Sequence, residues 1–167
     1  MATSTSVIGH RTSTSRDGGF LIQFEVRLAH GYEQVWAAVS TAAGLRGWLA
    51  RADVLERRLG GAVTLTWPGG GPTVHGRVTA WDVERVAEYT VTGYGRIRLH
   101  LESAGPEATL LRFTNERRGG DADRLDALAA WHEHFERLAE ALDGHPVDWM
   151  TWTPDRRREL RAHYAAD

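Results

Sequence analysis

The chain has 167 residues, of which 42% are hydrophobic and 25% are charged, and its formal net charge is −2. This length and balance predict one soluble domain, and the near-neutral charge gives no basis for binding nucleic acid or an anionic membrane. The absence of cysteine excludes disulfides and thiolate metal sites. Because no apolar run reaches the length of a membrane span and no signal-peptide pattern is present, we expect a cytoplasmic protein.

The first 19 residues are rich in serine and threonine and end in an Asp-Gly-Gly turn signal. We expect residues 1–19 to form a mobile N-terminal tail. The turn signal leaves open a short strand over Val7–Ser15, paired with the segment that follows it. That segment, Phe20–Leu28, alternates apolar and polar side chains, which predicts a half-buried strand.

After Gly31 the apolar period lengthens to three or four residues, which is typical of a helix. Tyr32, Val35 and Trp36 share one face of a first short helix, and a second short helix runs from Ser40-Thr41 to Leu49. Helices this short are not stable alone, so both must pack on a sheet.

Five or six strand candidates follow without another helix, separated by turns rich in glycine and proline. Short connections favour an antiparallel meander, so we expect an antiparallel sheet of six or seven strands in total. The candidates span Arg51–Arg57, Ala62–Trp67, Thr73–Trp81, Arg85–Thr92, Arg96–Ser103 and Thr109–Glu116.

The segment Asp121–Leu142 has the clearest helical period in the chain, and Gly144 and Pro146 provide the signals that end it. We expect this helix to lie across the concave face of the sheet. In the C-terminal extension, residues 145–167, Trp149 and Trp152 precede a last short helix. Two exposed tryptophans would form a sticky patch, so we expect them to pack on the outer sheet surface or against a second subunit in a homodimer.

The order strand, two short helices, strands and long helix resembles the START/birch-pollen-allergen superfamily, also called SRPBCC. Within it the chain is most similar to the branch named after the activator of the Hsp90 ATPase. The matching features are Val35-Trp36, Leu45 with Trp48, Gly60-Gly61, Gly76-x-Val78, Thr109-x-Leu111, and Trp131 with Leu138. The resemblance implies an α+β helix-grip fold over residues 20–144, in which a curved antiparallel sheet wraps around the long helix and leaves a cavity.

The strand rows expected to face that cavity are almost entirely apolar and contain no carboxylate, so paired acids for catalysis are not evident. An apolar chamber with a few polar groups is typical of a small-ligand site. We predict a ligand-binding cavity lined by Trp67, Tyr89, Phe113, Trp131, His132 and Phe135. His132 and Tyr89 would orient the ligand, unless the two side chains are core residues that hydrogen-bond to their neighbours.

A metal site is not expected, because His132 and His134 point to different sides of a helix, whereas zinc helices use the i, i+4 spacing. Gly69-Gly70-Gly71 lacks the Lys-Ser/Thr pair of a phosphate loop and is interpreted as a hairpin turn. The run Arg156-Arg157-Arg158 is interpreted as a solvated helix face. No cofactor is predicted.

Three functions fit these observations. The first is binding of a small hydrophobic molecule, aromatic or lipid-like, and the second is a cyclase or dehydratase reaction on a polyketide-like substrate in the same cavity. The third, implied by the branch name, is a co-chaperone of the heat-shock ATPase. The lack of inward carboxylates counts against the second. The short segment before the helix-grip region counts against the third, because the full activator carries an additional N-terminal domain.

Overall fold

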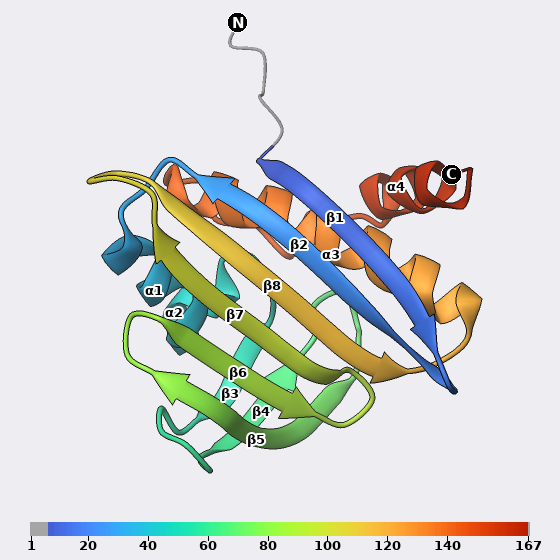
Figure 1. Cartoon of the computed structure of the whole chain (residues 1–167), viewed down its shortest axis with the longest axis horizontal. Coiled ribbons are helices and arrows are strands. Elements are labelled where there is room, and N and C mark those ends of the chain that lie inside the picture. The colour runs from blue at the N-terminus through green and yellow to red at the C-terminus, as the bar shows by residue number, and fades with distance from the viewer. Residues whose placement is uncertain (1–6, 167) are drawn as a thin grey trace, which may run out of the picture.

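One antiparallel sheet of eight strands dominates the computed structural model, which describes residues 7–166 (Figure 1). The strand order is β1-β2-β8-β7-β6-β5-β4-β3. Strands that are adjacent in sequence therefore pair with each other, except that β2 pairs with β8 and β3 lies at the opposite edge of the sheet. The strands are β1 Ile8–Arg16, β2 Gly19–Leu28, β3 Arg51–Leu55, β4 Ala62–Thr66, β5 Thr73–Asp82, β6 Val86–Val91, β7 Gly95–Ser103 and β8 Thr109–Arg118.

The expected count of six or seven strands is too low, because β1 is an eighth strand of the sheet. Ser15 pairs with Phe20 and Arg16 with Gly19 across the Asp-Gly turn, and the pairing continues to Ile8. The mobile-tail prediction is therefore wrong for residues 8–16, and the alternative of a paired strand is confirmed. Its β-strand signal is weak, since most of its side chains are polar and exposed and gain little from burial. The rest of that prediction, over residues 1–6, lies outside the described residues.

Four helices accompany the sheet: α1 Tyr32–Ser40, α2 Ala42–Arg46, α3 Asp121–Leu142 and α4 Asp155–Ala165. Figure 1 shows α3 behind the sheet and crossing its strands, α1 and α2 together at one end, and α4 beside α3. The bounds of α3 are those predicted. It begins where the Asp123 carboxylate accepts a hydrogen bond from the Gly120 backbone N–H at 2.9 Å, and it ends before Gly144, whose φ is 91°.

The concave face of the sheet carries the core. The inward rows predicted from alternation are buried in β2, β6, β7 and β8, and Val63 and Leu65 are buried in β4. Phe135 of α3 lies at the centre, with its ring centroid 4.9 Å from Phe113, 5.5 Å from Phe24 and 6.0 Å from Trp48. Rings from the sheet, α3 and the segment after α2 thus fill the space beneath this part of α3.

Candidate functional site

A cavity of about 190 Å³ lies beside this core, between the turn that joins β4 to β5, the helix α3, and the C-terminal extension. Aromatic side chains from four separate segments line it, and α3 contributes two alanines, Ala127 and Ala130. The aromatic residues are Trp67, Tyr94, Trp131 and Trp152. The polar residues His134, Arg117 and Arg157 also reach its wall.

Close ring contacts fix the aromatic walls. The Trp67 and Tyr94 ring centroids are 4.8 Å apart at an interplanar angle of 78°, an edge-to-face contact. Trp152 closes over the β4–β5 turn at Gly69, where φ is 72° and a Cβ atom would lie 2.8 Å from the indole ring. A side chain at this position would therefore displace Trp152, and the glycine allows the turn and the extension to meet.

His134 is a fixed, neutral imidazole in the wall of the cavity. Its Nδ1 lies 2.9 Å from the Trp48 carbonyl oxygen, so Nδ1 carries the proton and donates it. Its Nε2 is then an acceptor and faces Nη2 of Arg157 at 3.5 Å. Burial, aided by the positive charge of Arg157, lowers the pKa of His134 to about 3. At neutral pH the ring is therefore uncharged, with a donor at Nδ1 and an acceptor at Nε2.

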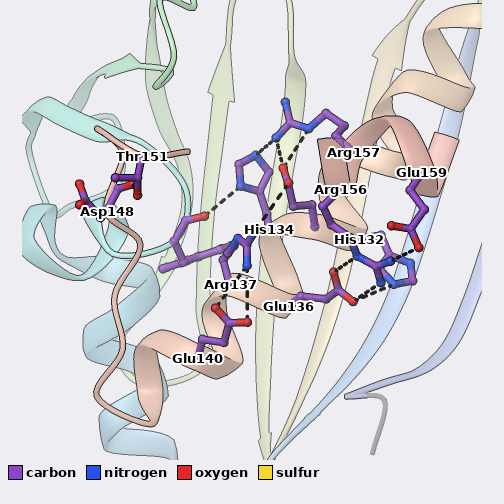
Figure 2. Close-up of polar contacts among 12 residues, drawn as sticks. His132, His134, Glu136, Arg137, Glu140, Asp148, Thr151, Arg156, Arg157 and Glu159 are labelled. Atoms are coloured by element: carbon purple, nitrogen blue, oxygen red, sulfur yellow. Dashed lines mark hydrogen bonds and ion pairs between the residues drawn. The ribbon is translucent and has the colours of Figure 1, made fainter. Parts of the chain in front are cut away.

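Arg157 links the extension to α3. Its guanidinium lies 2.8 Å from the carboxylate of Glu133, whose side chain is 1% exposed, and it also lies 5.2 Å from the Trp152 ring centroid. Figure 2 shows Arg157 directed toward His134 on one side of α3, while Arg156 is directed toward Glu136. The prediction of a solvated arginine face is thus wrong for Arg156 and Arg157, which are partly buried against ion-pair partners on another helix.

Two buried donors in the cavity wall have no hydrogen-bond acceptor among residues 7–166. They are Nε of Arg117 and Nε1 of Trp152. Trp67 Nε1 also makes no well-aligned hydrogen bond, although it is close enough to the Tyr94 hydroxyl to lower the pKa of that group. Burial raises the pKa of Tyr94, and the Arg117 charge and the Trp67 indole oppose the rise. The wall therefore presents donors in excess of acceptors.

Of the residues predicted to line a ligand cavity, Trp67 and Trp131 line this one. Tyr89, Phe113 and Phe135 are fully buried in the core. The Tyr89 hydroxyl donates to the Val39 carbonyl oxygen at 2.7 Å, and burial raises its pKa, which matches the alternative of a core tyrosine. A ligand-binding role for these residues stays a prediction, and the cavity supports it for the two tryptophans.

His132 lies on a different face of α3, beneath α4. Its Nδ1 lies 2.7 Å from the Tyr164 hydroxyl oxygen. Its Nε2 lies 3.7 Å from the carboxylate of Glu136 (Figure 2). Burial alone would raise the pKa of Glu136, but His132 and Arg156 outweigh it and lower the pKa to about 2. The polar break in the helix stripe thus marks the docking surface for α4.

Sequence reasoning missed Tyr94, Arg117, His134, Trp152 and Arg157 as cavity residues. Two signals were available. His134 is three residues after Trp131 and so shares its side of the helix. Arg117 continues the inward row Leu111, Phe113, Asn115 by one more step of two. Trp152 and Arg157 offered no such signal, because their positions depend on how the extension docks.

The extension packs on its own chain. Besides Trp152 at the cavity, Trp149 donates from Nε1 to the Arg46 carbonyl oxygen at 2.6 Å. The two tryptophans thus pack as expected, but on α2 and the cavity mouth instead of the outer sheet surface. No helix within residues 7–166 is long and apolar enough to cross a membrane.

A larger groove of about 670 Å³ lies at the opposite end of α3. Its walls are mostly small or aliphatic, including Ala104, Ala108 and Ala139, and its His30 and Asp143 side chains pair with each other at 2.8 Å. In the described part of the chain, no buried polar atom without a hydrogen-bond partner belongs to its lining. The aromatic cavity is therefore the better candidate for a specific site.

Solved structures share this architecture. A conserved protein of unknown function from Enterococcus faecalis matches with a TM-score of 0.74 and 16% identity, over 93% of this chain and 88% of that one. CalU16 from Micromonospora echinospora matches with a TM-score of 0.70 and 16% identity, over 94% and 96%. The Aha1 dimer from Colwellia psychrerythraea matches with a TM-score of 0.60 and 21% identity, over 73% and 95%.

At these identities the likeness shows the fold alone, a helix-grip architecture in which an antiparallel sheet packs against a long C-terminal helix. The profile of the family described as activator of Hsp90 ATPase homolog 1-like protein matches residues 30–143, and the chain belongs to this family. No match was found among curated proteins. Trp152 and Arg157 lie beyond the matched stretch, so part of the cavity wall is not contributed by the region that defines the family.

Proposed function

We propose that this protein binds a small aromatic molecule in the cavity formed by the β4–β5 turn, α3 and the C-terminal extension. The observation that carries the proposal is the partly open space of about 190 Å³ bordered by the rings of Trp67, Tyr94, Trp131 and Trp152. Ring faces favour a flat, apolar guest because stacked and edge-to-face contacts add to the burial of apolar area.

The volume of the cavity limits the size of the ligand. A cavity of ~150 Å³ holds benzene, and drug-sized ligands need upwards of ~300 Å³. About 190 Å³ therefore suits a molecule of one ring or two fused rings. Of the two ligand classes that the sequence predicts, this space favours the aromatic one over the lipid-like one.

The polar groups of the wall favour binding over catalysis. His134 has a pKa lowered to about 3 and its proton is committed to the Trp48 carbonyl, so it is a poor proton shuttle near neutral pH. Burial raises the pKa of the Tyr94 hydroxyl further from neutrality. A cyclase or dehydratase role would leave both groups without a proton-transfer function, and we place it second.

A co-chaperone role rests on the family description, and no surface feature of residues 7–166 singles out a protein partner. The relative from Colwellia is a dimer. In this chain the extension that we considered as a dimer contact is occupied by its own α2 and α3. The homodimer stays a prediction, which sedimentation velocity at several protein concentrations would check.

A cavity-filling variant tests the proposal. We expect 2-naphthol to bind the wild-type protein in a saturation-transfer NMR titration, and Ala130→Leu to abolish that binding because its side chain enters the cavity. Ala122→Leu, an exposed position on the same helix, is the matched control and should bind like the wild type. Equal binding by both leucine variants, or no binding of naphthyl probes by any protein, would overturn the proposal.

A further inference from the structure

We propose that the guest of this cavity is an aromatic carboxylic acid, bound as its anion, and that Arg117 receives the carboxylate. This inference rests on the proposed function, because it names the chemical class of ligand for the same cavity. Its basis is a local excess of positive charge and of unused hydrogen-bond donors, which an apolar guest alone would leave unsatisfied.

Arg117 is held in place by packing. It is the last inward residue of β8 and pairs across the sheet with Phe20. Its guanidinium carbon lies 5.1 Å from the Tyr94 ring centroid and 5.7 Å from that of Phe20. Contacts of a guanidinium with two aromatic rings restrict its motion and weaken its hydration, which prepares it for a second, anionic partner.

The charge of Arg117 has no carboxylate partner within ion-pair distance in the described chain, and its buried Nε has no acceptor. Arg157, the other cation of the wall, differs because Glu133 neutralises it at 2.8 Å. Among residues 7–166, no aspartate or glutamate lines the cavity. The wall therefore carries one uncompensated positive charge.

Acidic side chains do occur nearby, at the outer side of Arg117, but each is engaged. The Asp123 carboxylate accepts the N–H of Gly120 at 2.9 Å and caps α3. Asp126 forms an ion pair with Arg161 of α4. Neither contact involves Arg117, so a ligand carboxylate would not displace an existing ion pair.

A second donor supports an acceptor-rich ligand. Trp152 Nε1 is buried in the same wall without an acceptor. A carboxylate offers two oxygens with about four lone-pair sites, whereas an amine would add donors to a wall that already has too many. Hydrogen bonds to a charged acceptor are also stronger than those to a neutral one, which favours the acid over its amide.

Three probes of one shape test the inference at neutral pH: 2-naphthoate, 2-naphthamide and 2-naphthylmethylamine. We expect the wild-type protein to bind naphthoate about ten-fold or more tightly than naphthamide in calorimetric or NMR titrations, and to bind the amine most weakly. In Arg117→Gln the acid and the amide should bind within about three-fold of each other, and Arg117→Lys should restore part of the preference.

Arg118→Gln is the matched control, since it removes an equal charge one residue away on the exposed side of β8 and should keep the preference for the acid. Thermal unfolding verifies that each variant folds. If Arg117→Gln does not fold, Arg117→Met, which keeps the apolar stem against the rings, takes its place. Equal affinity for acid and amide in the wild type, or a preference that survives the loss of Arg117, overturns the inference. Failure of all three probes to bind instead overturns the proposed function.

Discussion

Two adjacent stripes of α3 face the inside of the molecule, and one is closely packed whereas the other borders a cavity. One carries Leu128, Phe135 and Leu138, which are fully or almost fully buried, and Phe135 contacts rings from the sheet and from Trp48. The other carries Ala127, Ala130, Trp131 and His134, and it borders the cavity. Both are rich in aromatic contacts, yet one space is filled and the other is not.

The difference comes from what stands opposite each stripe. Phe135 is surrounded by rings held on regular strands, which interdigitate at close-packed density. The second stripe offers two alanines and meets Trp67 and Trp152, which sit at a turn and on the C-terminal extension. Large rings held by turns and small residues held by a helix leave space between them, and this space is the proposed ligand site.

The largest effect is expected in the filled stripe. Phe135→Ala should lower the free energy of unfolding by about 4 kcal/mol, because it removes a fully buried ring from the centre of the core. Trp67→Ala, in the wall of the cavity, should cost about half as much or less, since that ring is only partly buried. Urea unfolding of both variants measures the difference, and equal losses would mean that the two regions are packed alike.

The next largest loss of stability is expected from the contact between the C-terminal extension and α3. Arg157→Met should destabilise the protein by about 3 kcal/mol, because it leaves the carboxylate of Glu133 buried without its closest cation. Adding Glu133→Gln should recover much of that loss, since a buried amide costs less than a buried charge. A double-mutant cycle in urea measures the coupling, and simple additivity of the two substitutions would argue against the ion pair.

Acidic pH should lower the stability of the folded protein through His134, in the cavity wall. The pKa of His134 is 6.5 in an ordinary environment and about 3 here, so below pH 6.5 the unfolded chain takes up a proton that the folded chain does not. Stability is thus lost as pH falls from 6.5 toward 3, by about 2 kcal/mol at about pH 5 from this group. His134→Asn keeps a donor for the Trp48 carbonyl and should lose less stability than the wild type over this range. Identical pH profiles would show that His134 titrates normally.

The smallest expected change in stability comes from adding a larger side chain, and it should differ between the cavity and the packed core. Ala130→Leu should change the free energy of unfolding by less than about 1 kcal/mol, because the new side chain enters the cavity. Ala87→Leu, in a fully buried inward row of β6, should cost about 1–3 kcal/mol by overpacking. If leucine at position 130 is as costly as at position 87, the cavity is not available to a side chain.

Sequence reasoning recovered the parts of the molecule that depend on local pattern. The helix Asp121–Leu142 followed from its period and its end signals, and the inward strand rows followed from alternation. The family resemblance carried the topology. The strand β1 has only a weak local pattern, since its polar residues are stabilised mainly by pairing with β2.

The candidate site was only partly accessible to the same reasoning. Trp67 and Trp131 were predicted, and both line the cavity. His132 was chosen because it breaks an apolar stripe, but Tyr164 of α4 accounts for that break. Once α4 is placed, His132 belongs to a helix–helix contact and His134 belongs to the cavity, although the two are neighbours in sequence.

The sequence by itself therefore determined the elements and their buried faces, because period, turn chemistry and capping act over a few residues. Tertiary structure alone decided where the space is left and which charges remain unpaired. Arg157 is neutralised because the docking of the extension on α3 brings it to Glu133, whereas Arg117 contacts two aromatic rings and forms no ion pair among residues 7–166. Such pairings join residues far apart in the chain, and no local pattern records them.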